Sequence, residues 1–307
     1  MLNTNKTLIL VVRSESIEDF RSIAKRIRKI DPNMDIIIFG GEIFLHQIPS
    51  HFLNQPTLTI YLVNPPLIKK SNDLAVKHLS KIDEYAHFKQ HNIPCLPIEK
   101  FAWGMTLDES IYGDWVVIKP ENINSSGKDI NMIPTKAISS LKLSDFPLDH
   151  LIHQDNYLVQ KFIKTGQKST QYRAGIFLDE VIYSRTFTSD IDYSKPGTDL
   201  PRLLKTSVAS NVTNRSVGRI IDEAMNCLAL EVAKTLPQLP LFGIDILKDE
   251  ISGKLYVLEI NAGGNIWHFS SLSARKKNVD RKALVLQYNA WDKCAEALIR
   301  KVNELAS

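Results

Sequence analysis

The chain has 307 residues, 44% of them hydrophobic and 23% charged, which supports two or three packed lobes and excludes a wholly disordered or fibrous protein. Lysine and arginine (38) exceed aspartate and glutamate (34) only slightly, so no nucleic-acid partner is expected. No run of about 18 apolar residues predicts a membrane span, and the three widely spaced cysteines predict neither a disulfide framework nor a zinc cluster. The first residues do not show the pattern of a secretory leader, so we expect a cytoplasmic protein.

The first third of the chain predicts a small α/β domain over residues 1–75. An apolar run at 8–12 predicts a strand, and a helix-start signature at 16–19 is followed by apolar residues at helical spacing. Two further apolar runs, 35–39 and 57–63, end at Gly or Pro residues, so we expect a parallel sheet. No glycine-rich phosphate loop follows the first strand, which argues against dinucleotide or P-loop binding there.

The rest of the chain predicts strands with few helices. The break at Asn92–Pro94 marks a change of domain, and short strand-like runs follow it. A helix is expected at 217–236, between these runs and two more strands at 241–247 and 255–261. Apolar residues at helical spacing between 286 and 305 predict a final helix that packs in the core.

Acidic and amide side chains interrupt the last two apolar runs. Alternation along a strand predicts that Val257, Glu259 and Asn261 project from one face, and Asp245 lies in the strand before them. An antiparallel pairing would place two carboxylates together, where they repel unless a cation lies between them. Oxygen donors without His or Cys favour Mg²⁺ or Mn²⁺, which implies a nucleotide. The alternative is that these acids form ordinary caps or ion pairs.

A lysine and a polar loop form a second candidate element. Lys119 ends an apolar run, and residues 122–127 then form a small polar loop that contains Gly127. Such a loop can close over phosphates with its backbone N–H groups. An ordinary surface hairpin fits the same residues.

In this order, these residues resemble the ATP-grasp superfamily, especially its glutathione-synthetase-like and ribosomal-protein-glutamate-ligase-like members. The resemblance runs through most of the chain and implies an α/β N-terminal domain followed by the two α+β lobes of an ATP-grasp fold. It implies a small lobe with a mobile phosphate loop at 76–160 and a large lobe with the metal site at 161–307. The implied cofactors are ATP and Mg²⁺, with Mn²⁺ as the alternative metal.

The resemblance also implies roles for single residues. The residues implied to bind the nucleotide are Lys81, Lys119, Ser125, Ser126, Gly127, Gln160, Lys161, Phe162 and Ile163. The implied metal ligands are Asp245, Glu259 and Asn261. The residues implied to face the reacting groups are Arg173, Asn265, Lys205 and Asn211. Gln167 stands where many relatives carry an acid for the ribose hydroxyls, so no ribose contact is predicted.

Two pairs of aromatic and histidine residues have alternative interpretations. His87 and His91 have the helical spacing of metal ligands, but no third ligand follows nearby, and a solvated helix face is favoured. Trp267 and His268 follow the strand that carries Glu259 and Asn261, so they could contact the acceptor; core packing is the favoured alternative.

The function implied by the resemblance is an ATP-dependent ligase that joins a carboxylate to an amine through an acyl phosphate and releases ADP and phosphate. The substrates would be a small-molecule or peptide carboxylate and an amine acceptor, with no nucleic acid or membrane involved. The alternative is a non-catalytic nucleotide-binding or sensor protein with the same fold. The sequence leaves the identity of the substrates and the oligomeric state open, a homo-oligomer included.

Overall fold

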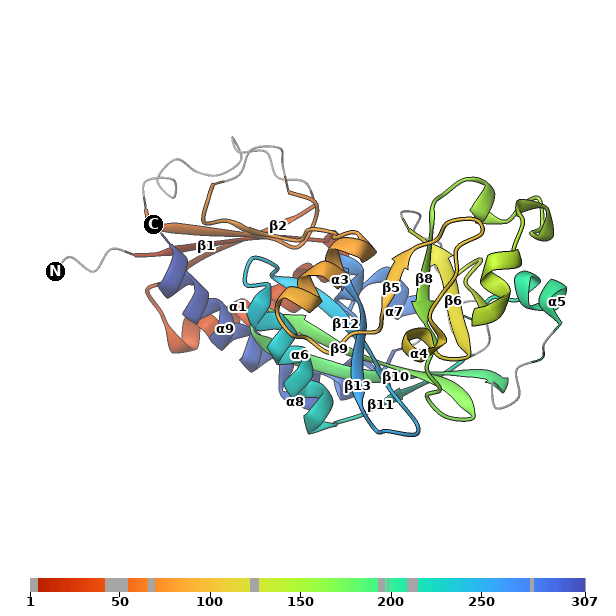
Figure 1. The fold of residues 1–307 in the computed structure, drawn as a ribbon. Helices are drawn as coiled ribbons and strands as arrows, with labels where there is room; N and C mark the ends of the chain where they lie inside the picture. The colour runs from red at the N-terminus through yellow and green to blue at the C-terminus, as the bar shows by residue number, and fades with distance from the viewer. Residues whose placement is uncertain are drawn as a thin grey trace.

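A computed structural model describes residues 5–41, 55–65, 70–121, 127–192, 197, 199–208, 215–276 and 279–306. These residues form a four-stranded parallel sheet, a second four-stranded sheet and a five-stranded sheet, arranged in space as Figure 1 shows. Among the described residues, no helix has both the length and the apolar character that a membrane span needs.

The N-terminal sheet has the strand order β2-β1-β3-β4, and its pairs are parallel. Its elements are β1 (Thr7–Val12), α1 (Ile17–Ile30), β2 (Asp35–Gly40), β3 (Thr57–Tyr61) and β4 (Leu74–Ala75). All six residues of β1 are buried, because the central strand of a parallel sheet is covered on both faces. The small parallel sheet expected from the sequence in the N-terminal part is therefore confirmed.

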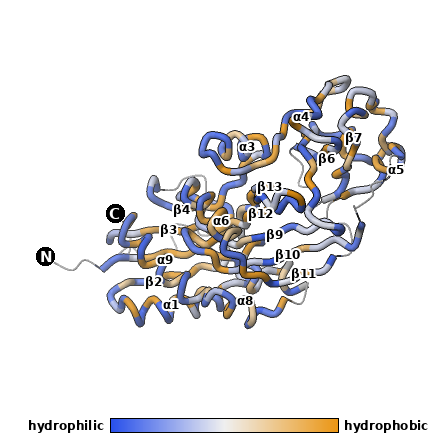
Figure 2. Tube along the Cα trace, turned by 60° about the horizontal axis from the view of Figure 1, so that its bottom comes forward, coloured by the Kyte–Doolittle hydropathy of each residue, from blue (hydrophilic) through white to orange (hydrophobic). Residues whose placement is uncertain are grey.

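The C-terminal helix α9 (Ala290–Leu305) packs against α1 and this sheet. Its fully buried residues include Cys294 and Leu298, and they share one hydrophobic core with Phe20 and Ile23 of α1. The core continues into the five-stranded sheet through residues such as Phe177, and Figure 2 shows the hydrophobic stretches of these elements gathered in the body of the molecule. The first and last parts of the chain thus form one core.

The second sheet is antiparallel and has the order β5-β8-β6-β7. It contains β5 (Ile98–Lys100), β6 (Trp115–Pro120), β7 (Asn131–Pro134) and β8 (Tyr157–Lys161). Helix α3 (Lys81–Gln90) precedes it in the chain. Shorter helices of this region are α4 (Glu109–Tyr112), η3 (Thr135–Ser140), η4 (Leu143–Asp145), η5 (Leu151–His153) and α5 (Leu200–Lys205).

The five-stranded sheet is antiparallel and has the order β11-β10-β9-β12-β13. Its strands are β9 (Lys168–Phe177), β10 (Glu180–Asp192), β11 (Arg215–Arg219), β12 (Leu241–Lys248) and β13 (Leu255–Ala262). The remaining helices are η1 (Ser14–Ser16), α6 (Glu223–Thr235), η6 (Gly264–Ile266), α7 (Leu272–Lys276) and α8 (Arg281–Tyr288). Helix α6 covers one face of the sheet with a hydrophobic core, while the opposite face joins the core of the N-terminal sheet through Phe177, Tyr183 and Leu241.

The helix expected at 217–236 begins later than its apolar pattern predicts. Val217 instead lies in β11 and pairs with Phe187 of β10, while α6 starts at Glu223. The side chain of Asp222 accepts a hydrogen bond from the backbone N–H of Met225 and caps the helix. A tertiary strand pairing therefore removed the first turns of the expected helix.

Candidate functional site

Five charged side chains form one row across the five-stranded sheet. Each is directly opposite the next in the strand register, from β11 through β10, β9 and β12 to β13. Directly paired residues of antiparallel strands project from the same face, so the row lies on the face opposite α6. In order, its members are Arg219, Arg185, Arg173, Asp245 and Glu259.

Asp245 occupies the row between Arg173 and Glu259 and is fully buried. The Arg173 guanidinium binds both carboxylate oxygens of Asp245: Nε is 2.6 Å from Oδ1, and Nη2 is 2.6 Å from Oδ2. Burial raises the pKa of Asp245 to about 6, against the opposing pull of Arg173, and the Glu259 carboxylate adds to the rise. A cation beside both acids would relieve this repulsion.

Glu259 and Asn261 complete the predicted trio of ligands. The Asn261 amide nitrogen donates to Asp245 Oδ2 at 3.1 Å and to Glu259 Oε1 at 3.2 Å, so the three side chains converge. Burial opposes ionisation of Glu259, but Lys119, the Asn261 amide and Arg173 outweigh it and lower the pKa of this carboxyl. Glu259 is thus held as a carboxylate that faces positive groups.

This donor set fits a hard divalent cation. Two carboxylates and an amide supply oxygen atoms alone, and Mg²⁺ characteristically takes a few such ligands together with substrate phosphates. The described residues contain no cluster of three or more His, Cys, Asp or Glu side chains suited to a metal. A cation here would therefore need ligands from the substrate as well as from Asp245, Glu259 and Asn261.

The predicted alternation along β13 is wrong at one residue. Asp245 pairs with Glu259 while the next residue, Ile246, pairs with Val257, so Leu258 is an extra residue in β13 and forms a β-bulge. Val257 consequently lies in the core under α6, opposite to Glu259, instead of sharing its face. Leu258 and Glu259 are both half-buried.

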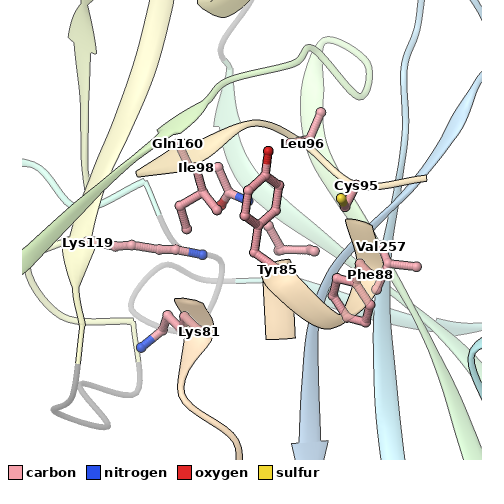
Figure 3. A pocket seen from close by; sticks show the side chains of 10 residues that line it. Lys81, Tyr85, Phe88, Cys95, Leu96, Ile98, Lys119, Gln160 and Val257 are labelled. Carbon is pink, nitrogen blue, oxygen red and sulfur yellow. The ribbon is translucent and has the colours of Figure 1, made fainter. Parts of the chain in front are cut away.

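The two predicted nucleotide lysines approach the site from other elements. Lys119 is the last residue but one of β6 and is 5% exposed. Burial lowers the pKa of its amine, Glu259 opposes this change and Lys81 adds to it. Lys81 begins α3, and its Nζ donates to the backbone carbonyls of Pro120 at 2.9 Å and Glu121 at 3.2 Å. Figure 3 shows both lysines at one end of a pocket.

That pocket lies where α3, β5, β6, β8 and β13 meet. Its far end is apolar, and Tyr85 stands between this end and the lysines (Figure 3). The side chains that line it are Lys81, Tyr85, Phe88, Cys95, Leu96, Ile98, Lys119, Gln160, Val257 and Leu258. An apolar cavity that ends at two amines matches the chemistry of a base linked to phosphates.

The four residues from Gln160 to Ile163, which the resemblance implies bind the nucleotide, lie at the end of β8 and just after it. Gln160 is buried and lines the pocket, and Ile163 is also buried. The backbone N–H of Lys161 donates to the carbonyl of Pro97, and that of Phe162 donates to the carbonyl of Trp115. These two hydrogen bonds thus hold residues 161 and 162 beside the second sheet.

Sequence reasoning missed Glu84, a buried acid of α3. Its Oε2 accepts a hydrogen bond from the backbone N–H of Ile260 at 3.1 Å, which ties α3 to β13 between two of the predicted ligands. Burial and the nearby Glu259 carboxylate raise the pKa of Glu84 to about 8. The available signal was its position one helical turn after Lys81, on the same side of the helix.

The remaining predicted site residues are Ser125, Ser126, Gly127, Lys205, Asn211 and Asn265. Ser125, Ser126 and Asn211 lie outside the described residues, whereas the carbonyl of Gly127 accepts a hydrogen bond from Ser207 Oγ at 2.5 Å. Lys205 is exposed at the end of α5, whose Leu204 packs in the core of the second sheet. Asn265 is exposed in η6, just beyond β13.

The open alternatives for the aromatic and histidine residues are resolved by their contacts. Trp267 is 1% exposed in the core and donates from Nε1 to Asp19 Oδ2 at 2.8 Å. His268 stacks on Tyr183 and its Nδ1 is 3.5 Å from Nη1 of Arg185, so it lies on the site face of the sheet. His87 binds the Thr235 hydroxyl at 2.8 Å, as part of an ordinary contact between helices.

The fold class follows from the order and type of these sheets. A parallel four-stranded sheet followed by two antiparallel sheets is the arrangement of ATP-grasp ligase structures, and the chain has this fold. No family model matches the sequence, and no curated protein matches it either.

Two structures of the ATP-grasp ligase PsnB are similar over nearly their full length. PsnB complexed with minimal precursor, Mg and ADP is 13% identical, covers 98% of this chain and 99% of its own, and has a TM-score of 0.51. PsnB complexed with minimal precursor is 14% identical, covers 98% and 100%, and has a TM-score of 0.50. A D-alanine–D-alanine ligase from Bacillus anthracis aligns at 14% identity over 97% and 98% of the two chains, with a TM-score of 0.49.

Proposed function

We propose that this protein is an ATP- and Mg²⁺-dependent ligase that joins a carboxylate to an amine. The observation that carries the proposal is the convergence of Asp245, Glu259 and Asn261 on one face of the five-stranded sheet. The buried amine of Lys119, in the second sheet, lowers the pKa of Glu259 there. Paired acids beside a buried lysine are suited to a metal–phosphate group held between two lobes.

In the proposed reaction, a substrate carboxylate oxygen attacks the γ-phosphorus of ATP, the bond to the β-phosphate oxygen breaks, and ADP leaves. The amine of the acceptor then attacks the acyl carbon, phosphate leaves, and the amine nitrogen loses a proton. Lys81 and Lys119 would bind the phosphates, and Arg173, oriented by Asp245, would face the transferred group. A bound Mg²⁺ would neutralise phosphate charge as it develops.

The substrate class is proposed from chemistry and from the similar structures. PsnB is complexed with a precursor in the structures that share this fold. We therefore include peptide carboxylates with small-molecule acids among the proposed substrates. The order of the lysines, the arginine and the metal ligands along the chain supports a function like that of the glutathione-synthetase-like or ribosomal-protein-glutamate-ligase-like members.

The test is carboxylate-dependent release of ADP from ATP and Mg²⁺ over a panel of acids, including peptides, paired with amines. Glu259→Gln should reduce turnover by at least about a hundredfold, because it removes a carboxylate ligand of the proposed Mg²⁺, which would neutralise phosphate charge. Glu250→Gln, in the exposed turn between β12 and β13, is the matched control and should keep wild-type turnover. Full activity of Glu259→Gln would disprove the metal assignment, whereas ATP binding without ADP release on any pair would favour the non-catalytic alternative.

A further inference from the structure

Arg185 is a buried cation that the protein leaves largely uncompensated. Arg185 is 8% exposed, and its Nε has no hydrogen-bond partner among the described residues. Its closest polar contact, His268 Nδ1 at 3.5 Å from Nη1, is an imidazole and carries no negative charge. Within the described part of the chain, no carboxylate forms an ion pair with Arg185, although it lies next to Arg173 in the charged row.

The surroundings of Arg185 add positive charge. Three guanidinium groups surround the ring of Phe187, with Cζ atoms of Arg173, Arg185 and Arg215 at 5.5, 5.7 and 4.6 Å from its centroid. Burial lowers the pKa of Arg185, and the charge of Arg173 lowers it further. Asp245 already gives both oxygens to Arg173, and the ring face attracts the Arg185 guanidinium without neutralising it. This end of the row therefore favours a bound anion.

The position of Arg185 separates this anion from the phosphates of ATP. The residues proposed to bind the phosphates, Lys81 and Lys119, lower the pKa of Glu259 at the acidic end of the row. Arg185 is two strands away from Asp245, which corresponds to about 10 Å across a sheet. An anion at Arg185 is thus placed as a remote group of the substrate whose reacting carboxylate lies near Asp245.

We propose that Arg185 binds a second carboxylate of the substrate, so that the acid activated by this protein carries at least two carboxylates. This inference rests on the proposed ligase function for the reacting carboxylate. An aspartyl or glutamyl side chain, or the C-terminal carboxylate of a peptide, has the required chemistry. A bidentate guanidinium contact would select a carboxylate over a neutral amide at this position.

The test uses the full-length protein, the variant Arg185→Gln, and glutarate and butyrate as acids with two carboxylates and one. Removing an uncompensated buried cation should raise the melting temperature in low-salt buffer, the opposite of the loss expected for a structural arginine. Glutarate should raise the melting temperature of the wild type by at least about 2 °C, and by more than butyrate at equal ionic strength. Arg185→Gln should lose the glutarate shift.

Arg21→Gln is the matched control, since Arg21 is exposed on α1 and pairs with Glu18. It should change neither the starting melting temperature nor the glutarate shift. A lower melting temperature for Arg185→Gln, an unchanged glutarate shift in that variant, or equal shifts with butyrate and glutarate in the wild type would each overturn the proposal.

Calorimetry with AMP-PNP and Mg²⁺ separates this proposal from the ligase function. Arg185→Gln should bind AMP-PNP within about threefold of the wild type, because the residue is placed away from the phosphates. A tenfold or greater loss would assign Arg185 to the nucleotide and overturn the second-carboxylate subsite. Wild-type protein that binds glutarate through Arg185 but does not bind AMP-PNP would contradict the proposed function and leave the subsite supported.

Discussion

At the residue scale, the buried acids of the site are held in different protonation states by their neighbours. The positive charge of Lys119 and the hydrogen bond from the Asn261 amide lower the pKa of Glu259. Burial and the Glu259 carboxylate together raise the pKa of Glu84 to about 8. Glu84 also accepts the Ile260 N–H, so its position is fixed. One buried acid is thus kept neutral beside one kept charged.

Glu84→Gln should therefore change stability in a pH-dependent way. The unfolded chain loses the Glu84 proton above its ordinary pKa of 4.5 while the folded protein keeps it up to about 8, so wild-type stability falls as pH rises through this window. Gln retains the acceptor oxygen and has no proton to lose. Relative to wild type, we expect the variant to gain about 1.4 kcal/mol per pH unit across the window, as an upper limit.

Urea unfolding at about pH 5.5 and about pH 7.5 measures this difference. Glu250→Gln, on the exposed turn, should match the wild type at both values. A stability difference between Glu84→Gln and wild type that is the same at the two pH values would contradict the raised pKa of Glu84.

At the element scale, the first turn of helix α3 positions Lys81, which is predicted to bind phosphate. Ser80 caps α3: its hydroxyl accepts the Asp83 N–H at 3.1 Å, and Lys81 is the first residue of the helix. Ser80→Ala should lower the free energy of unfolding by about 1 kcal/mol and weaken AMP-PNP binding roughly two- to fivefold, since the helix end that carries Lys81 frays.

The control for this prediction is the cap of another helix. Asp280 accepts the Ala283 N–H at 3.0 Å at the start of α8, so Asp280→Ala should cost a similar stability without changing nucleotide affinity. Calorimetry and urea unfolding of both variants decide the outcome. If the two variants weaken AMP-PNP equally, the cap acts through general stability and not through Lys81.

At the scale of the whole molecule, one core joins elements from both ends of the chain. Leu298 of α9 is fully buried in the core that includes α1, the parallel sheet and Phe177 of the five-stranded sheet. Between these parts, Asp19 of α1 accepts hydrogen bonds from Trp267 and Arg281. The domain limits at residues 75 and 160 stay predictions, but this packing favours a single cooperative unit for the first and last parts.

Leu298→Ala should thus cost roughly 2–5 kcal/mol in the free energy of unfolding and shift one transition. Leu286→Ala on α8, whose side chain is 68% exposed, is the matched control and should stay within about 0.5 kcal/mol of wild type. Far-UV circular dichroism and tryptophan fluorescence should report the same midpoint. Two separate midpoints, only one of them moved by Leu298→Ala, would show that the parts unfold independently.

Much of the fold was accessible from the sequence, because hydrophobic periodicity reports which side of an element is buried. The parallel first sheet, the two late strands and the last helix from Ala290 onward followed from local patterns, and the fold class followed from the resemblance. The helical pattern expected from 286 to 305 is broken at Asn289, whose left-handed backbone separates α8 from α9. The start of α6 did not follow from such a pattern, because an apolar residue such as Val217 fits a helix and a strand equally well. The pairing of Val217 with Phe187 decided for the strand.

The sequence by itself placed Asp245, Glu259 and Asn261 on two adjacent strands and named the lysines that would face them. Only the tertiary structure decided the bulge at Leu258, which turns Val257 into the core while Glu259 stays opposite Asp245. It also aligned Arg185 and Arg173 with the two acids, although these residues are far apart in the chain. Strand register and bulges depend on pairing between distant segments, and no local pattern in one segment encodes its partner.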